Sequence, residues 1–98
     1  QYTPWGYIGH MKTETKKLLQ NRLRRIEGQV RGLQELVEKE TYCIDVITQT
    51  SAIKSALSGV EDLLLENHLD TCASKQIKAG NIAKAKKEIL AVYRLKRK

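Results

Sequence analysis

Aromatic side chains are scarce in this chain: its 98 residues contain four tyrosines, one tryptophan and no phenylalanine. Large aromatic side chains supply much of the apolar surface that a core buries, so one chain of this size has little material for a core of its own. No apolar run approaches the roughly 18 residues that a membrane-spanning helix needs. We therefore expect a small protein that is stabilised by association with copies of itself and that has no membrane partner.

Proline and methionine are almost absent, with Pro4 and Met11 the only examples. The pair His10 and Met11 is typical of a cloning junction, so we expect residues 1–10 to be a tag remnant and residues 11–98 to form a single domain. No export signal follows Met11, and the chain has only two cysteines. This combination predicts that the protein is located in the reducing cytoplasm, where thiols bind metal or sense redox state more often than they form structural disulfides.

Patterns typical of strands and of enzyme active sites are also missing after Met11. We find no strand alternation, no phosphate-binding loop and no nucleophile motif, so we do not expect an enzyme. Helical periodicity is present instead. The first predicted helix has apolar residues at spacings of 4, 3, 4, 3 and 4, a heptad-like stripe. That stripe consists of Leu19, Leu23, Ile26, Val30, Leu33 and Val37.

A second, longer helix is predicted from a possible N-cap at Thr41 to about Cys72. Gly80 and Asn81 then separate it from a third helix, whose apolar face contains Ile82, Ala85, Ile89 and Val92. The second helix is apolar on two sides, which indicates burial on two sides and calls for partner chains. One of its faces is predicted to contain Val46, Ile53, Leu57, Val60 and Leu64, and the other Ile44, Ile47, Ala52, Ala56 and Leu63.

Positive charge is concentrated at the two ends of the domain. Lys12–Gly32 has a net charge of +5, Leu33–Ser74 of −6 and Lys75–Lys98 of +8. Basic ends around an acidic middle are typical of a surface that binds a polyanion such as nucleic acid, although solvated helix faces give the same pattern. Candidate phosphate contacts on the first helix are Lys16, Lys17, Arg22, Arg24 and Arg25.

A histidine and a cysteine four positions apart, in the stretch NHLDTC, form a candidate metal site. His68 and Cys72 share one face of the predicted second helix, which lets both side chains bind one ion. Cys43, the other thiol, lies 25 residues before His68. At about 1.5 Å per residue, a continuous helix separates them by roughly 38 Å. An antiparallel copy of the helix would bring Cys43 of one subunit to His68 and Cys72 of the other, and would cover the second apolar face as well.

Two thiolates and one imidazole form a soft set of three ligands. Such ligands favour Cu(I) and zinc, but Cu(I) accepts three ligands whereas structural zinc requires four. No further histidine follows Met11 except His68. We therefore expect one Cu(I) per protomer at an intersubunit site.

The stretches RLRRIEGQVRGL, YCIDVITQTSAIKSAL and ENHLDTC, in this order, resemble the copper-sensitive operon repressor family of bacterial regulators. The resemblance covers essentially everything after Met11. It implies an all-α, three-helix protomer with a long central helix, which forms an antiparallel dimer and then a dimer-of-dimers tetramer. It further implies a helical metal-sensing domain that binds operator DNA without metal and releases it on binding Cu(I), switching on copper export genes. A copper chaperone is a candidate metal donor.

Individual roles follow from the same resemblance. It implies Cys43 from one subunit and His68 with Cys72 from its partner as the Cu(I) ligands. Tyr42 matches a tyrosine beside the ligands, and Glu88 matches a glutamate that accepts a hydrogen bond from the ligand histidine. Further, Arg22 matches a DNA-contacting arginine, and Lys54 lies where relatives often have a basic residue.

The sequence leaves open two alternatives to a copper-responsive repressor. Persulfide-sensing members of the family resemble this chain at Cys43 and Cys72 but lack the histidine, so His68 favours copper. A copper buffer that does not bind DNA would use the same ligands and leave the basic surface merely solvated.

Overall fold

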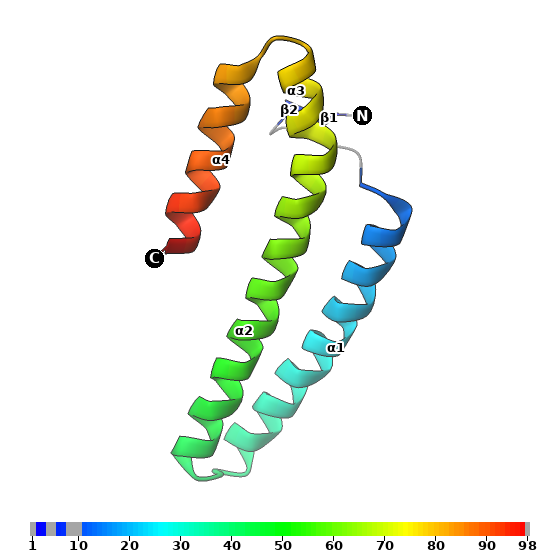
Figure 1. The fold of residues 1–98 in the computed structure, drawn as a ribbon. Helices are drawn as coiled ribbons and strands as arrows, with labels where there is room; N and C mark the ends of the chain where they lie inside the picture. The colour runs from blue at the N-terminus through cyan, green and yellow to red at the C-terminus, as the bar shows by residue number, and fades with distance from the viewer. Residues whose placement is uncertain (1, 4–5, 8–10, 98) are drawn as a thin grey trace. The chain divides into compact units, whose positions relative to one another are not determined.

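The computed structural model describes residues 2–3, 6–7 and 11–97 (Figure 1). The chain divides into two compact units, one formed by Lys12–Leu65 and the other by Gln1–Met11 with Glu66–Lys98. In the segment expected to be a tag remnant, strand β1 (Tyr2–Thr3) pairs antiparallel with β2 (Gly6–Tyr7); its other residues lie outside the described part. None of the helices described is long and apolar enough to cross a membrane.

The described residues after Met11 form helices and the turns between them, which confirms the predicted all-α fold class. Its helix α2 continues through a short π-helix and α3 without a break, because the backbone at His68, Ala73 and Ser74 stays in the right-handed helical region. The predicted second helix is therefore one run that extends beyond Cys72. The elements are α1 (Thr13–Glu38), α2 (Cys43–His68), the π-helix η1 (Leu69–Ala73), α3 (Ser74–Lys78) and α4 (Ile82–Arg97).

Helix α1 ends in a defined turn just before α2, and α2 begins later than predicted. Glu40 has a φ of 52°, and the amide of Thr41 donates to the carbonyl of Leu36 at 3.0 Å. This is a Schellman motif, which closes a helix with one left-handed residue. The first carbonyl acceptor of α2 is that of Tyr42, which accepts a hydrogen bond from the amide of Asp45. The N-cap predicted at Thr41 was wrong by one residue.

The same motif ends α3 at the predicted break. Gly80 has a φ of 83°, and the amide of Asn81 donates to the carbonyl of Gln76 at 2.7 Å. Glycine adopts this left-handed backbone without a steric penalty. The turn lets α4 follow directly, and it places α3 and α4 together in one of the two units.

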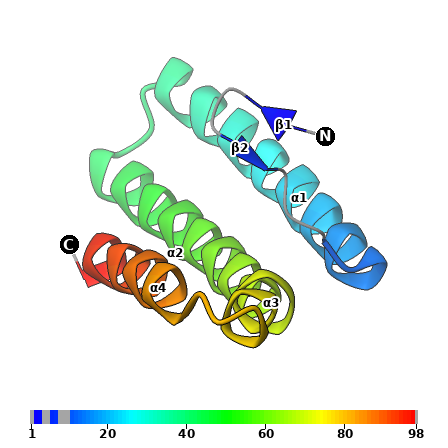
Figure 2. The ribbon, with the colours of Figure 1, turned by 90° about the horizontal axis from the view of Figure 1, so that it is seen from above.

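In the unit Lys12–Leu65, α1 and the matching part of α2 form an antiparallel hairpin (Figures 1 and 2). The stripe predicted for α1 is buried at only one position in each heptad. Leu19 and Ile26 are buried and Leu33 packs against them. Leu23, Val30 and Val37, the alternate positions, are exposed. The hairpin thus uses half of the stripe and leaves the other half uncovered.

The phase predicted for α2 was partly wrong. Ile53 and Val60 are buried against α1 as expected, but Ala56 and Leu63, assigned to the other face, pack with them. Leu57 and Leu64, assigned to the same stripe, are 43% and 40% exposed. The face of α2 that packs against α1 therefore lies between the two predicted stripes and takes residues from both. Ile44 and Ile47 are exposed as well.

In the unit that contains α3 and α4, small side chains occupy the tightest positions. Ala73 and Ala85 are each only 2% exposed. On the predicted apolar face of α4, Ile89 and Val92 are half-buried, whereas Ile82 is exposed. Close packing around alanine brings the helix backbones near each other, and this positions polar side chains of α3 and α4 for direct contact.

Candidate metal centre and DNA-binding surface

The three predicted metal ligands lie at the two ends of the long helical run. Cys43 is the first residue of α2, His68 is its last, and Cys72 lies in η1. Both thiols are free; that of Cys43 is exposed and that of Cys72 is half-buried. His68 and Cys72 belong to one unit and Cys43 to the other. Within the described part of this single chain, no three His, Cys, Asp or Glu side chains form a group that could hold a metal.

The turn that contains Cys72 is a π-helix, in which the hydrogen bonds span five residues instead of four. Two hydroxyl groups support it: Ser74 Oγ donates to the carbonyl of Leu69 at 2.7 Å, and Thr71 Oγ1 to that of Asn67 at 2.7 Å. The wider turn changes the direction of Cys72 around the helix axis relative to His68. Single π turns of this kind occur frequently at functional sites.

The Thr71 hydroxyl also lies 3.6 Å from Sγ of Cys72. A hydroxyl has one proton, so it donates to either the Asn67 carbonyl or the sulfur at any moment. A thiolate accepts a hydrogen bond more strongly than a thiol does, because it is charged. Thr71 is therefore placed to stabilise Cys72 once the thiol has lost its proton, which is the form that binds metal.

One ring nitrogen of His68 lacks the partner that a buried polar atom normally has. Nε2 is buried and accepts or donates no hydrogen bond among the described residues. Buried polar atoms without partners are uncommon, and each calls for an explanation such as an ion that the atom binds. An unpartnered imidazole nitrogen one turn before a free thiol fits a soft metal ion, so the chemistry of this pair agrees with the predicted ligand role.

Glu88 has a different partner from the one that the resemblance implies. Its Oε1 accepts a hydrogen bond from Nε2 of Gln76 at 2.7 Å, joining α4 to α3. No hydrogen bond joins Glu88 to His68 in the described residues. Oε1 of Gln76 is buried and unpartnered. In this structure the carboxylate is held near the turn at Gly80 by an amide, and the proposed bond to His68 stays a prediction.

Tyr42 is 69% exposed, and its carbonyl starts the hydrogen bonding of α2. Nothing in the described chain covers its ring. Tyr42 directly precedes Cys43 in the chain, so it is adjacent in sequence to a candidate ligand.

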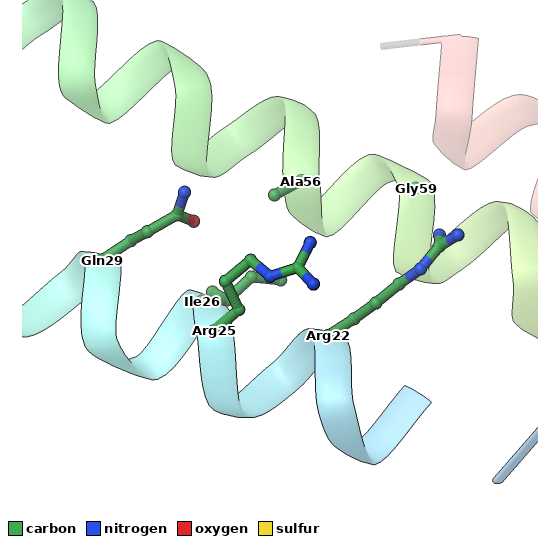
Figure 3. A pocket seen from close by; sticks show the side chains of 6 residues that line it. All are labelled: Arg22, Arg25, Ile26, Gln29, Ala56 and Gly59. Carbon is green, nitrogen blue, oxygen red and sulfur yellow. The ribbon is translucent and has the colours of Figure 1, made fainter. Parts of the chain in front are cut away.

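The predicted DNA contacts are exposed and lie in the unit Lys12–Leu65. The guanidinium of Arg22 lies over α2, where a Cβ on Gly59 would be 3.6 Å from Nη1 (Figure 3). Lys54 is an exposed residue of α2 itself. The exposed basic residues of α1 in this set are Lys16, Lys17, Arg22, Arg24 and Arg25.

Sequence patterns missed several of these contacts. Gln76 has no motif of its own; its pairing with Glu88 depends on the register of the α3–α4 turn. The hydroxyls of Thr71 and Ser74 gave a signal, because Ser and Thr within a helix often bond a preceding carbonyl and distort the turn. The closeness of Gly59 to Arg22 depends on the phase of α2, which the pattern placed incorrectly.

Comparison with known proteins places the chain among bacterial regulators. Residues 15–94 match the model of a family described as metal-sensitive transcriptional repressors. The chain is 41% identical over 87 residues to the copper-sensing transcriptional repressor CsoR of Bacillus subtilis, covering 89% of this chain and 86% of that protein. It is 46% identical over 71 residues to the copper-sensing transcriptional repressor RicR of Mycobacterium tuberculosis, covering 72% of this chain and 74% of that protein.

A solved structure has the same fold. The crystal structure of the copper-sensing repressor CsoR with Cu(I) from Geobacillus thermodenitrificans NG80-2 superimposes with a TM-score of 0.84 and is 40% identical in sequence. The match covers 95% of this chain and 97% of that one. The relatives are named as transcriptional repressors, and none of these names describes an enzyme.

The hydrogen bond between Gln76 and Glu88 generates a prediction about stability. A double-mutant cycle of Gln76→Ala and Glu88→Ala, measured by urea unfolding at fixed protein concentration, should give a coupling of about 1–2 kcal/mol, because a charged acceptor strengthens the hydrogen bond. The matched cycle of His68→Ala and Glu88→Ala should give a coupling near zero. A larger coupling to His68 than to Gln76 would contradict this arrangement.

Proposed function

Because the chain belongs to the metal-sensitive transcriptional repressor family, we propose that it is a Cu(I)-responsive repressor that binds operator DNA without metal and releases it when Cu(I) binds. The observation that carries this proposal is the ligand set: two free thiols, at Cys43 and Cys72, and a buried, unpartnered imidazole nitrogen at His68. These residues occur in a fold that matches a repressor crystallised with Cu(I). The chain would act in the cytoplasm, where both DNA and reduced thiols are present.

The site is completed by a second copy of the chain. Cys43 and His68 are the first and last residues of the 26-residue helix α2, and a continuous helix of this length is roughly 39 Å long. An antiparallel copy of α2 places Cys43 of one protomer beside His68 and Cys72 of the other, and its symmetry makes two equal sites. Two such dimers would then form the tetramer.

Exposed apolar side chains support this association. Leu23, Val30 and Val37 on α1 are uncovered, and α2 exposes Leu57 and Leu64. No side chain of the described core is fully buried. Apolar surface of this extent on a small helical chain is typical of an interaction surface. A partner helix would bury it and would supply the missing ligand at the same time.

Copper fits these ligands better than the other soft metals. Cys43, His68 and Cys72 would hold Cu(I) in a three-ligand site, one ion per protomer, whereas structural zinc requires a fourth ligand. Cu(I) would displace the protons of the two thiols and would fix the positions of its ligands. Thr71, 3.6 Å from Sγ of Cys72, would donate to the thiolate.

Glu88 is the candidate link between the ligands and the basic helix α4. A histidine that binds metal through one ring nitrogen keeps a proton on the other, and a carboxylate commonly accepts it. In the structure Glu88 accepts a hydrogen bond from Gln76. Transfer of its hydrogen bond to His68 would alter the contact between α3 and α4 and would move the lysines of α4. A typical coupling of about 1–3 kcal/mol would lower DNA affinity about 5- to 150-fold.

Thiol chemistry is the second candidate, favoured by the exposure of Cys43. A polysulfide could link Cys43 to Cys72 of the partner subunit, since thiolates attack sulfur–sulfur bonds. The unpartnered imidazole of His68 has no role in that reaction, so we rank copper first. A copper buffer would need neither the exposed basic residues of α1 nor an effect of metal on DNA.

Mixed assemblies test whether the two chains share the ligands. Cys43→Ser and Cys72→Ser should each abolish high-affinity Cu(I) binding. A dimer that contains one chain of each variant has one site with all three ligands and one site that lacks both thiols. We expect this heterodimer, once it is separated from the two homodimers, to bind half of the wild-type amount of copper in competition with a Cu(I) chelator. Recovery no greater than that of the two parents would show that one chain supplies all the ligands.

The role of Glu88 is tested by comparison with its partner Gln76. Glu88→Ala should bind Cu(I) with nearly unchanged affinity but retain DNA when copper is added, because the acceptor for His68 is gone. Gln76→Ala removes the same hydrogen bond and keeps the carboxylate, so DNA should still be released. Both responses are measured by fluorescence anisotropy of labelled DNA under anaerobic conditions. If Glu88→Ala releases DNA as completely as the wild type, Glu88 is not the link.

A further inference from the structure

Gln76 lies near the end of α3, and it contacts both the turn that follows and the next helix. Its backbone carbonyl accepts a hydrogen bond from the amide of Asn81 at 2.7 Å, which closes α3. Its side-chain Nε2 donates to Oε1 of Glu88 at 2.7 Å, and both side chains are half-buried. The turn joins α3 to α4 within one unit (Figure 1). One residue therefore holds the end of α3 and the position of a carboxylate of α4.

The orientation of the Gln76 amide is determined by its partner. An ionised carboxylate only accepts hydrogen bonds, so the amide nitrogen and not the amide oxygen faces Glu88. That oxygen, Oε1 of Gln76, is then buried without a partner among the described residues. A hydrogen bond to a charged acceptor is favourable, but a buried oxygen without a donor costs part of that gain. The contact is therefore specific, yet weak enough for another donor to replace it.

The other donor is a candidate metal ligand in the same unit. Gln76 lies eight residues after His68 along one helical run, so about 12 Å of helix separates the two residues. Nε2 of His68 is buried and has no partner among the described residues, Glu88 included. A buried ring nitrogen would bond to a carboxylate within its reach. The position that Gln76 gives to Glu88 is therefore out of reach of His68, and the two donors compete for one acceptor.

A metal ion would strengthen only one of these two donors. An imidazole that binds a metal through one ring nitrogen keeps a proton on the other, and the charge of the metal makes that N–H a better donor. The Gln76 amide is not a ligand, so its strength as a donor is the same with and without metal. The competition for Glu88 would thus favour Gln76 without metal and His68 with metal.

We propose that Gln76 is a positioning residue that holds Glu88 away from His68, and that this competition sets the concentration of Cu(I) to which the protein responds. The inference rests on the proposed Cu(I)-responsive function and extends it to a residue outside the ligand set. A stronger bond at Gln76 raises the cost of moving Glu88 to His68 and so weakens Cu(I) binding. Loss of the bond removes that cost and strengthens Cu(I) binding.

Two substitutions of opposite effect at position 76 provide the test. Gln76→Met keeps a side chain of similar length and removes the donor. Gln76→Lys replaces the amide with a charged donor, which binds a carboxylate more strongly. Ala79→Lys adds the same charge at an exposed position just after α3 and is the matched control. The Cu(I) affinity of the full chain, free of DNA, is measured under anaerobic conditions by competition with a Cu(I) chelator.

Gln76→Met should bind Cu(I) on the order of tenfold more tightly than the wild type, the size expected for one hydrogen bond to a charged group. Gln76→Lys should bind Cu(I) more weakly by a similar factor, and Ala79→Lys should match the wild type. A positive charge near the thiolates would by itself tighten Cu(I) binding, so weaker binding in Gln76→Lys is opposite to the general electrostatic effect. In a Glu88→Ala background, which lacks the shared acceptor, Gln76→Met and Gln76→Lys should bind Cu(I) alike.

The amide of Gln76 also reports on the competition directly. Its side-chain N–H signals, followed by NMR, should differ between the metal-free wild type and Glu88→Ala, because only the wild type has the acceptor. Addition of one Cu(I) per chain should move the wild-type signals to the positions that they have in Glu88→Ala. A contact that only stabilises the turn would keep its signals in place when Cu(I) binds.

If Gln76→Met does not fold, as judged by its unfolding temperature, Gln76→Lys and the amide signals test the inference without it. Cu(I) affinity that is unchanged or shifted in the opposite direction in either folded variant overturns the role of Gln76. Differences that persist in the Glu88→Ala background, or amide signals that Cu(I) does not move, overturn it as well. These results need no DNA, whereas the proposed function fails if Cu(I) does not release DNA from the wild type.

Discussion

The long helical run from Cys43 to Lys78 carries more apolar surface than one chain can cover, and the rest of the structure depends on this constraint. Helix α1 covers the face that contains Ile53 and Val60, and Leu57 and Leu64 stay exposed beside it. A chain with few aromatic residues has no other element in the Lys12–Leu65 unit to bury them. We propose that association with a second copy covers this surface and that the same association brings thiols from opposite ends of α2 together.

The candidate metal ligands and the candidate DNA contacts are separated along the chain. His68 and Cys72 belong to the unit that contains α3 and α4, and the basic residues of α1 belong to the other unit. Two features of this unit are the candidates for a change on metal binding: the π turn around Cys72, and the carboxylate of Glu88, which accepts a hydrogen bond from Gln76. A second arrangement of either one, favoured by the metal, is what the proposed switch requires.

Much of this arrangement could be predicted from the sequence, because it depends on local signals. Periodicity located the helices, and Gly80 marked the turn at which the chain adopts a left-handed backbone. The softness and spacing of Cys43, His68 and Cys72 indicated the metal before any comparison. The phase of α2 was less accessible, since apolar residues on two faces leave the position of α1 undetermined. The pair Gln76 and Glu88 and the closeness of Arg22 to Gly59 depend on contacts between helices, which no single segment encodes.

We propose that copper, and not sulfur, controls DNA binding through an intersubunit site. The most direct measurement is an anaerobic titration with Cu(I). The reduced, metal-free protein is first bound to fluorescent DNA from upstream of its own gene, and release of the DNA is followed as Cu(I) is added. We expect stable binding of DNA without metal and complete release at one Cu(I) per chain. Retention of DNA beyond that ratio, together with release by a persulfide donor alone, would contradict it.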